Sequence, residues 1–244
     1  MNTTAITAHS GSDGTMRDSL SSLEKGIALG ADCVEVDVRL DAEGRLRLSH
    51  DARTDYQGAA FLRDALRRVA EAGAKVNCDL KQPAAIYPVL EMAESCGLER
   101  DRLILSGSVS LELLAADAAV SRRAQVFLNI EEICKFLLAG RTRDMRALFT
   151  APWDALRPEY EGLMRERMAW VADTALNLGA SALNLPYQGV TPQHIDFFRQ
   201  QGIGLSLWTV NSAEDIASLL RARVKNITTL HVAEALRLRA SVAS

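Results

Sequence analysis

The chain has 244 residues, of which 48% are hydrophobic and 24% charged, a composition typical of a globular protein with a sizeable core. Its net charge is −3 and it carries no basic block, which argues against nucleic-acid binding by bulk electrostatics. The N-terminus lacks a basic start followed by an apolar run, and no stretch of about 18 apolar residues occurs, so we expect neither a secretory signal nor stable membrane insertion.

In chain order, hydrophobic periodicity predicts a strand at 5–8, a helix at 18–29, a strand at 33–38, an extended segment at 46–49, a helix at 61–72, a strand at 76–80 and a helix at 86–96. It then predicts a strand at 103–105, helix 111–119, strand 124–130, helix 132–138, a polar stretch at 140–158, helix 159–178, strand 182–185, helix 192–201, strand 205–210, helix 213–222, strand 226–229 and helix 232–240.

Eight strand–helix units remain when the 46–49 segment is counted as an excursion, and repeated units of this kind favour a parallel sheet. Eight units in a chain of about 250 residues favour a closed α/β TIM (β/α)₈ barrel over an open sheet. No Pro-, Gly- or Ser-rich linker divides the chain, so we predict a single domain, 1–244. No GxGxxG or Walker A pattern occurs, which argues against a dinucleotide or P-loop site.

Four scattered cysteines lack CxxC spacing, and we expect reduced core residues. They are Cys33, Cys78, Cys96 and Cys134. Reduced thiols and the missing secretory signal predict a cytoplasmic protein.

Three carboxylates lie on neighbouring predicted strands near their C-terminal ends, where the active site of a barrel is expected. Glu35 and Asp37 are two residues apart and therefore point to one face of their strand, and Asp79 ends the next principal strand. Carboxylates inside a barrel are costly unless they are paired or bind a cation. An all-oxygen set of ligands suits Mg²⁺ or Ca²⁺, with Mn²⁺ also compatible, so we predict one divalent-cation site.

Three basic residues occupy the same rim. Lys81 shares a strand face with Asp79 and, beside a cation, would bind an anion such as phosphate. His9 and His50 follow strand ends and have the right pKa range for a general base and a general acid. Each residue alone has a simpler interpretation, as a structural histidine, a solvated strand face or a surface charge. Their joint placement at strand ends favours an active site.

Four other residues are interpreted structurally. His194 and His231 lie at or near helix starts and are expected to be surface or capping residues. Trp153 and Trp170 are expected to pack the 159–178 helix on the barrel, and the alternative for Trp153 is a loop over the mouth of the site.

Several segments resemble the signature of the glycerophosphodiester phosphodiesterase family, and together they span about residues 5–236. Residues 9–11 read His-Ser-Gly, 30–38 read Gly-Ala-Asp-Cys-Val-Glu-Val-Asp-Val, and 49–51 read Ser-His-Asp. Residues 77–81 read Asn-Cys-Asp-Leu-Lys, which resembles the family's Glu-x-Lys strand, and 207–211 read Leu-Trp-Thr-Val-Asn, which resembles its Trp-Thr-Val-Asn strand.

This resemblance implies a phosphatidylinositol-phosphodiesterase-like TIM barrel that hydrolyses a small-molecule phosphodiester to an alcohol and glycerol 3-phosphate. The implied metal ligands are Glu35, Asp37 and Asp79, the implied acid–base pair is His9 and His50, and the implied substrate-binding residues are Lys81, Trp208 and Ser10.

The chain departs from the family pattern at several positions. Ser10 replaces the usual Arg, which loses a charged phosphate clamp, and Asp79 replaces the usual Glu. Arg-Asp-Ser at 17–19 stands where Glu-Asn-Thr is common, the region between His50 and Asp79 is short, and the last strand lacks the usual Thr-Asp ending. Two alternatives therefore stay open: a related phosphodiesterase or lyase of lysophospholipase D type, and a silent barrel that binds a phosphorylated ligand. The sequence does not indicate an oligomeric state.

Overall fold

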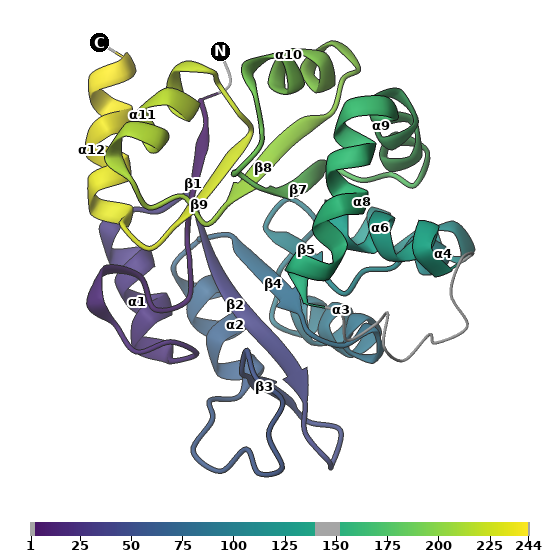
Figure 1. The fold of residues 1–244 in the computed structure, drawn as a ribbon. Coiled ribbons are helices and arrows are strands. Elements are labelled where there is room, and N and C mark those ends of the chain that lie inside the picture. The colour runs from purple at the N-terminus through teal and green to yellow at the C-terminus, as the bar shows by residue number, and fades with distance from the viewer. Residues whose placement is uncertain (1–2, 140–151, 244) are drawn as a thin grey trace.

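The computed structural model describes residues 3–139 and 152–243 and shows a closed barrel of eight parallel strands (Figure 1). The parallel strands are neighbours in chain order, and pairing of the first strand with both the last and the second closes the sheet. The predicted TIM barrel is therefore confirmed. Its strands are β1 (Ala5–Ala8), β2 (Cys33–Leu40), β4 (Val76–Leu80), β5 (Leu103–Gly107), β6 (Gln125–Asn129), β7 (Ala182–Pro186), β8 (Gly204–Trp208) and β9 (Asn226–Thr229).

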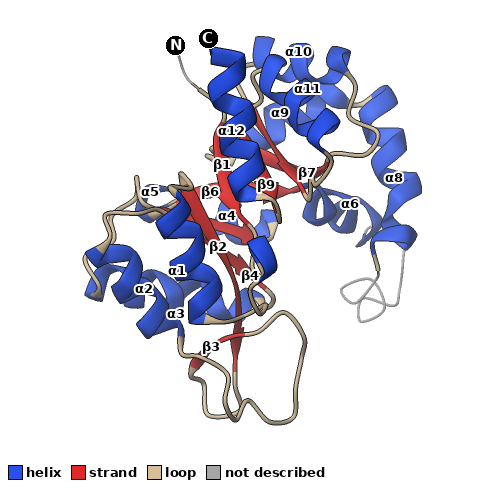
Figure 2. Cartoon of the chain, turned by 90° about the vertical axis from the view of Figure 1, so that its left-hand side faces the viewer, coloured by secondary structure: helices blue, strands red, loops and turns tan. Residues whose placement is uncertain are grey.

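Helices cover the outside of the barrel (Figure 2). They are α1 (Leu20–Leu29), α2 (Leu62–Glu71), α3 (Ile86–Ser95), α4 (Leu111–Ala116), α5 (Ala119–Arg123), α6 (Ile130–Ala139), α8 (Trp153–Glu166), α9 (Met168–Asn177), α10 (Pro192–Gln200), α11 (Ala213–Arg221) and α12 (Val232–Ala243), with short 3₁₀ turns at Ser12–Gly14 and Pro83–Ala85. Within 3–139 and 152–243, no helix has the length and apolar character needed to cross a bilayer.

Local chemistry explains where these helices begin and end. Before α1, the Ser19 side chain accepts a hydrogen bond from the backbone N–H of Ser22, and after it Gly30 takes a left-handed conformation with φ 84°. Before α11, Ser212 accepts in the same way from the backbone N–H of Asp215. These caps fix where α1 begins and ends and where α11 begins, which keeps their strand–helix units short.

The short strand β3 (Leu46–Leu48) folds back on the C-terminal half of β2 as an antiparallel partner. The turn between them is held by Asp41, whose carboxylate accepts hydrogen bonds from Arg45 at 2.8 Å and Arg47 at 2.9 Å. The backbone N–H of Ser49 then donates to the Asp37 carbonyl at 3.0 Å. This excursion therefore returns the chain to the rim of the barrel, and His50 arrives beside the end of β2.

Alternation along β2 separates two environments. Val34, Val36 and Val38 pack into the main core between the barrel and its helices. Cys33, Glu35 and Asp37 occupy the opposite face, toward the barrel axis. A small apolar cluster closes the interior at the N-terminal ends of the strands, and it consists of Cys33, Ile104, Phe127 and Ala182. The polar residues two positions further along these strands lie above this floor, near the rim.

The prediction of one helix at 159–178 is wrong, because α8 and α9 are separate helices joined at Arg167, which has φ −134°. The two helices bury different side chains, among them Tyr160 and Leu163 in α8 and Val171 in α9. α8 also begins within the predicted polar stretch and runs through Pro158. Residues 140–151 of that stretch lie outside the described residues. The sequence carries no breaker at 167, so tertiary packing decides the break.

Other boundaries also differ from the prediction; the strand expected at 205–210, for example, spans Gly204–Trp208. The helix expected at 111–119 divides into α4 and α5 at Asp117, because the Asp117 carboxylate accepts a hydrogen bond from the backbone N–H of Ala119 at 2.8 Å and starts a new helix. The strand expected at 124–130 ends at Asn129, and α6 begins at Ile130 rather than at Glu132. This earlier start places two glutamates in the first turn of α6, at the rim.

The structural interpretations of the cysteines and of two histidines are confirmed. All four cysteines, which lie within the described residues, are free; Cys33, Cys78 and Cys134 are buried and Cys96 is half-buried. His194 caps α10, because its Nδ1 accepts a hydrogen bond from the backbone N–H of Thr191 at 3.2 Å. His231 is exposed directly before α12.

Candidate active site

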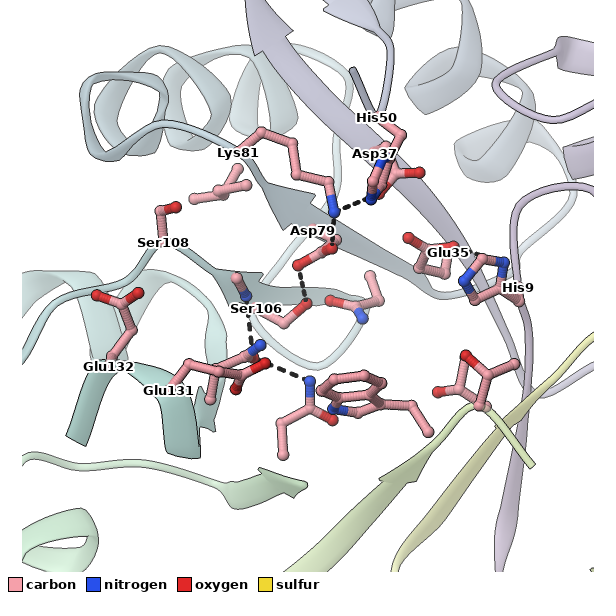
Figure 3. A pocket seen from close by; sticks show the side chains of 18 of the residues that line it. His9, Glu35, Asp37, His50, Asp79, Lys81, Ser106, Ser108, Glu131 and Glu132 are labelled. Carbon is pink, nitrogen blue, oxygen red and sulfur yellow. Dashed lines mark hydrogen bonds and ion pairs between the residues drawn. The ribbon is translucent and has the colours of Figure 1, made fainter. Parts of the chain in front are cut away.

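A pocket of ≈ 430 Å³ opens at the C-terminal rim of the barrel, where the active sites of TIM barrels lie (Figure 3). Seven of the eight predicted site residues line it, and these are His9, Glu35, Asp37, His50, Asp79, Lys81 and Trp208. Ser10 is the exception. The structure therefore brings seven residues that the sequence singled out into one pocket.

The three carboxylates converge because the strands that carry them are in register. Glu35 pairs with Asn77, and Asp37 pairs with Asp79, on the neighbouring strands β2 and β4. One carboxylate oxygen from each of Glu35, Asp37 and Asp79 lies within 4.8 Å of the other two. Burial, together with the negative charges of Asp37 and Asp79, raises the pKa of Glu35 well above its usual value. Three carboxylates this close therefore need positive charge beside them to be ionised together.

Lys81 supplies part of that charge. Its ammonium group lies 2.7 Å from Asp37 Oδ1 and also donates a hydrogen bond to Asp79 Oδ2. Burial opposes the charged ammonium, but Asp79 and Asp37 raise the pKa of Lys81 above its usual value. The other Asp79 oxygen accepts a hydrogen bond from the Ser106 hydroxyl at 3.1 Å. Gly107 follows with φ 75°, and a Cβ atom there would collide with Asp79 Oδ1.

The donors at this point fit a hard divalent cation. All of them are oxygen atoms, which favour Mg²⁺, Ca²⁺ or Mn²⁺ over Zn²⁺. Beside the trio, the buried Asn77 Oδ1 has no hydrogen-bond partner among the described residues. An orphaned amide oxygen next to three carboxylates is a further ligand that such an ion can use. The residues present are therefore compatible with the predicted cation site.

His9 is held in one tautomer. Its Nδ1 atom lies 2.8 Å from the carbonyl oxygen of Ser10, which can only accept, so Nδ1 carries the hydrogen and Nε2 is left as the ring's acceptor. Burial lowers the pKa of His9 below its usual value. A largely neutral imidazole with a free Nε2 has the properties of a general base.

His50 is held differently. Its Nδ1 donates to Asp51 Oδ1 at 2.8 Å, and 41% of its side chain is exposed. The backbone N–H of His50 donates to Asp18 Oδ2 at 2.9 Å. His50 therefore faces the pocket from a more open position than His9, with a carboxylate that orients its ring.

The predicted substrate contact of Ser10 is not supported by the structure. The Ser10 side chain is buried, and its hydroxyl accepts a hydrogen bond from the backbone N–H of Asp18 at 2.8 Å. Its own backbone N–H donates to Glu35 Oε2 at 2.8 Å. Because Asp18 also holds the backbone of His50, Ser10 connects the segments that carry the two histidines. Its hydroxyl stabilises the rim, whereas the prediction placed it against the substrate.

Arg17 is a pocket residue that the prediction missed. One guanidinium nitrogen lies 3.3 Å from Asp37 Oδ2, and 45% of the side chain is exposed. Arg17 brings a second cation to the pocket beside Lys81. Its only signal in the sequence was its position in the segment where Arg-Asp-Ser replaces Glu-Asn-Thr.

The first turn of α6 contributes two more residues that were missed, Glu131 and Glu132. The sequence prediction began this helix at Glu132, so it did not bring either side chain to the rim. Trp153 also lines the pocket, from the first turn of α8, and its ring packs on Tyr160 with centroids 5.2 Å apart. Trp153 therefore packs on the core as expected and also borders the site, although from a helix rather than a loop. Trp170 packs against the core beneath Arg167.

Ionisation of the buried Glu131 carboxyl lowers the stability of the folded protein. Burial raises its pKa to about 7, and the nearby charge of Asp79 adds to this. A carboxyl whose pKa is higher in the folded than in the unfolded chain loses stability as pH rises from about 4.5 to about 7. We expect Glu131→Gln to stabilise the metal-free protein by about 2 kcal/mol at pH 8, an increase in Tm of about 4–8 °C, and by much less at pH 5. Thermal unfolding of both proteins at the two pH values measures this, and an equal effect at both would contradict it.

A TIM barrel with three converging carboxylates, Lys81, Arg17 and two histidines at its rim has the groups that cleavage of a phosphodiester requires. Residues 9–64 match the Glycerophosphoryl diester phosphodiesterase family. The uncharacterized protein YqiK of Bacillus subtilis (strain 168) is 30% identical over 241 residues, which cover 93% of this chain and 94% of that protein. A glycerophosphodiester phosphodiesterase of Caldanaerobacter subterraneus subsp. tengcongensis is 26% identical over 235 residues, with 93% of each chain covered.

Among solved structures, a phosphodiesterase of Oleispira antarctica in complex with the product sn-glycerol-3-phosphate superposes with a TM-score of 0.68 at 14% identity, covering 99% of this chain and 98% of that one. This likeness shows the shared fold. Taken with the sequence matches, the chain belongs to the glycerophosphoryl diester phosphodiesterase family and is a phosphoric diester hydrolase.

Proposed function

We propose that this enzyme hydrolyses glycerophosphodiesters to an alcohol and glycerol 3-phosphate, with one divalent cation and two histidines. The observation that carries the proposal is the convergence of Glu35, Asp37 and Asp79 within 4.8 Å, in one pocket with His9 and His50. Support also comes from the Caldanaerobacter relative, which bears this activity in its name, and from the Oleispira phosphodiesterase, whose product is sn-glycerol-3-phosphate. A pocket of ≈ 430 Å³ suits a small diester.

Glu35, Asp37 and Asp79 would hold the cation, which is Mg²⁺ or Ca²⁺, with Mn²⁺ also compatible. When bound, it supplies positive charge that stabilises negative charge on the phosphate oxygens. Lys81 and Arg17 flank this position and add charge from the protein itself. We propose, as the sequence predicted, that Lys81 contacts the phosphate, and we add Arg17 as a second phosphate contact.

The two histidines divide the proton transfers. His9 Nε2 takes the proton from the glycerol hydroxyl next to the phosphoester, and that oxygen attacks phosphorus. The bond from phosphorus to the alcohol oxygen breaks, and His50 gives its Nε2 proton to the departing alcohol. Water then opens the cyclic phosphate with the roles reversed, which yields glycerol 3-phosphate. The tautomer of His9 and its lowered pKa support its assignment as the first base.

Arg17 is the residue that we expect to replace the missing arginine at position 10. Arg17→Ala should lower kcat/KM by about 10- to 100-fold, because a charged hydrogen bond to a phosphate oxygen is lost. The dissociation constant of glycerol 3-phosphate should rise in parallel. The exposed Arg122→Ala is the matched control. Loss of cation binding with unchanged affinity for glycerol 3-phosphate would mean instead that Arg17 acts only through Asp37.

The proposed function is tested with chelator-treated protein. Glycerophosphocholine, glycerophosphoethanolamine and bis(p-nitrophenyl) phosphate are assayed with Mg²⁺, Ca²⁺ or Mn²⁺ restored, and products are identified. Open glycerol 3-phosphate supports the proposal. A cyclic phosphate as final product would indicate a lyase, and release of a lysophosphatidate from lysophospholipids would indicate an activity of the lysophospholipase D type. Cation binding without turnover of any diester would leave a silent phospho-ligand-binding barrel.

The cytoplasmic location and the single domain remain predictions from the sequence.

A further inference from the structure

The pocket has a second end, formed by the first turns of α6 and α8. It is lined by Glu131, Glu132 and Lys135 from α6, by Trp153 and Leu156 from α8, and by Trp208 at the end of β8. Glu131 and Glu132 lie across the pocket from His9 and His50, beyond Ser106 and Ser108 (Figure 3). A diester whose phosphate lies beside Lys81 therefore extends one of its two alcohol groups toward this end.

This end of the pocket carries a formal negative charge of its own. Lys135 lies 2.8 Å from Glu132 Oε1 and neutralises that carboxylate. Glu131 forms no ion pair with a lysine or arginine among the described residues, and its buried Oε2 atom makes no hydrogen bond to them. The formal sum of two glutamates and one lysine at this end is one negative charge. At the other end Glu35, Asp37 and Asp79 outnumber Lys81 and Arg17 by one charge, and a divalent cation bound there would make that sum one positive charge.

The composition of this wall indicates a kind of ligand. A buried carboxylate oxygen without a hydrogen-bond partner, such as Glu131 Oε2, is costly unless a donor or a cation comes to it. Two indole rings border the same space, and indole faces attract ammonium and trimethylammonium groups within about 6 Å. A hydroxyl-rich or anionic head group would leave the Glu131 carboxylate without a counter-charge. A cationic head group satisfies the carboxylate and the rings at once.

We propose that the wall formed by Glu131, Trp153 and Trp208 binds the leaving alcohol and selects alcohols that carry an ammonium group, as in choline or ethanolamine esters. The inference rests on the proposed function and names the preferred class of its substrate. The substrate then lies with its phosphate toward Lys81 and Arg17 and with its cationic head toward Glu131. Glu131 lowers the stability of the metal-free protein, and a residue that does so agrees with a role in binding.

Competition assays test the preference. Equimolar glycerophosphocholine, glycerophosphoethanolamine and glycerophosphoglycerol are offered together, and the ratios of kcat/KM are read from product formation. We expect a preference of at least about 10-fold for the two substrates with cationic head groups, and Glu131→Gln should reduce that ratio by about 10-fold. The exposed Glu112→Gln is the control, and it should keep the wild-type ratio. A preference for the uncharged head group, or a ratio unchanged in Glu131→Gln, overturns the inference.

A binding measurement separates this inference from the proposed function. Choline and ethanolamine are titrated into the full-length protein while tryptophan fluorescence is followed, since Trp153 and Trp208 border the proposed subsite. Saturable quenching that weakens about 10-fold in Glu131→Gln supports the subsite even if no diester is hydrolysed. Absence of quenching by either alcohol, in a protein that hydrolyses diesters with uncharged head groups, overturns the subsite and leaves the proposed function standing.

Discussion

Glu35→Gln is expected to abolish the cation response of the protein while it stabilises the metal-free form. In the wild type, a cation at about 100 times its dissociation constant should stabilise the fold by about 2.7 kcal/mol, which raises Tm by about 5–10 °C. The variant loses one ligand, so its cation affinity and its turnover should fall by at least about 100-fold. Thermal unfolding with and without Mg²⁺ or Ca²⁺, together with a diester assay, measures both effects.

The metal-free part of this prediction follows from the pKa of Glu35. Burial and the charges of Asp37 and Asp79 raise that pKa, so ionisation of Glu35 lowers stability as pH rises above the usual range of a glutamate. A glutamine removes this cost, and its amide oxygen can still accept the hydrogen bond from the backbone N–H of Ser10. The metal-free variant should therefore unfold at a higher temperature at pH 8. Exposed Glu112→Gln is the control, and a wild-type cation response in Glu35→Gln would refute the proposed site.

His9→Ala and His50→Ala are each expected to lower kcat by about 10²- to 10⁴-fold with a natural diester, because each removes one proton transfer. Neither residue is a proposed ligand, so both variants should keep the cation-dependent rise in Tm. The exposed His231→Gln should retain wild-type activity and serves as the control. Steady-state kinetics with glycerophosphocholine and thermal unfolding with cation provide the two measurements.

A second substrate distinguishes the two roles. The p-nitrophenyl ester of glycerol phosphate releases an alcohol that needs little help from an acid. His50→Ala should therefore recover most of its p-nitrophenol release with this ester, while the cyclic phosphate accumulates because the second step still lacks its base. His9→Ala should stay impaired in p-nitrophenol release, since the attacking hydroxyl still needs a base. The opposite pattern would exchange the two assignments. Full activity of both variants with every diester would show that neither histidine transfers a proton.

Much of the fold was predictable because it depends on local pattern. Strand Val76–Leu80 was predicted with the observed bounds, and the strand–helix alternation indicated the barrel. Gly30 ends α1 because glycine adopts the left-handed conformation easily, which is a property of that one residue. The break at Arg167 was not predictable, because no residue there disfavours a helix and only the different surfaces buried by α8 and α9 require it.

The candidate site also has a part that the sequence predicted and a part that it did not. By itself, the sequence determined that Glu35, Asp37, Asp79 and Lys81 share the inner face of the barrel, since strand periodicity fixes side-chain direction and parallel strands end at one rim. Only the tertiary structure decided what the long loops and helix starts contribute. It turned the Ser10 hydroxyl toward Asp18, brought Arg17 to Asp37, and set Glu131 in the pocket wall. These placements depend on contacts between segments far apart in the chain, which no local pattern encodes.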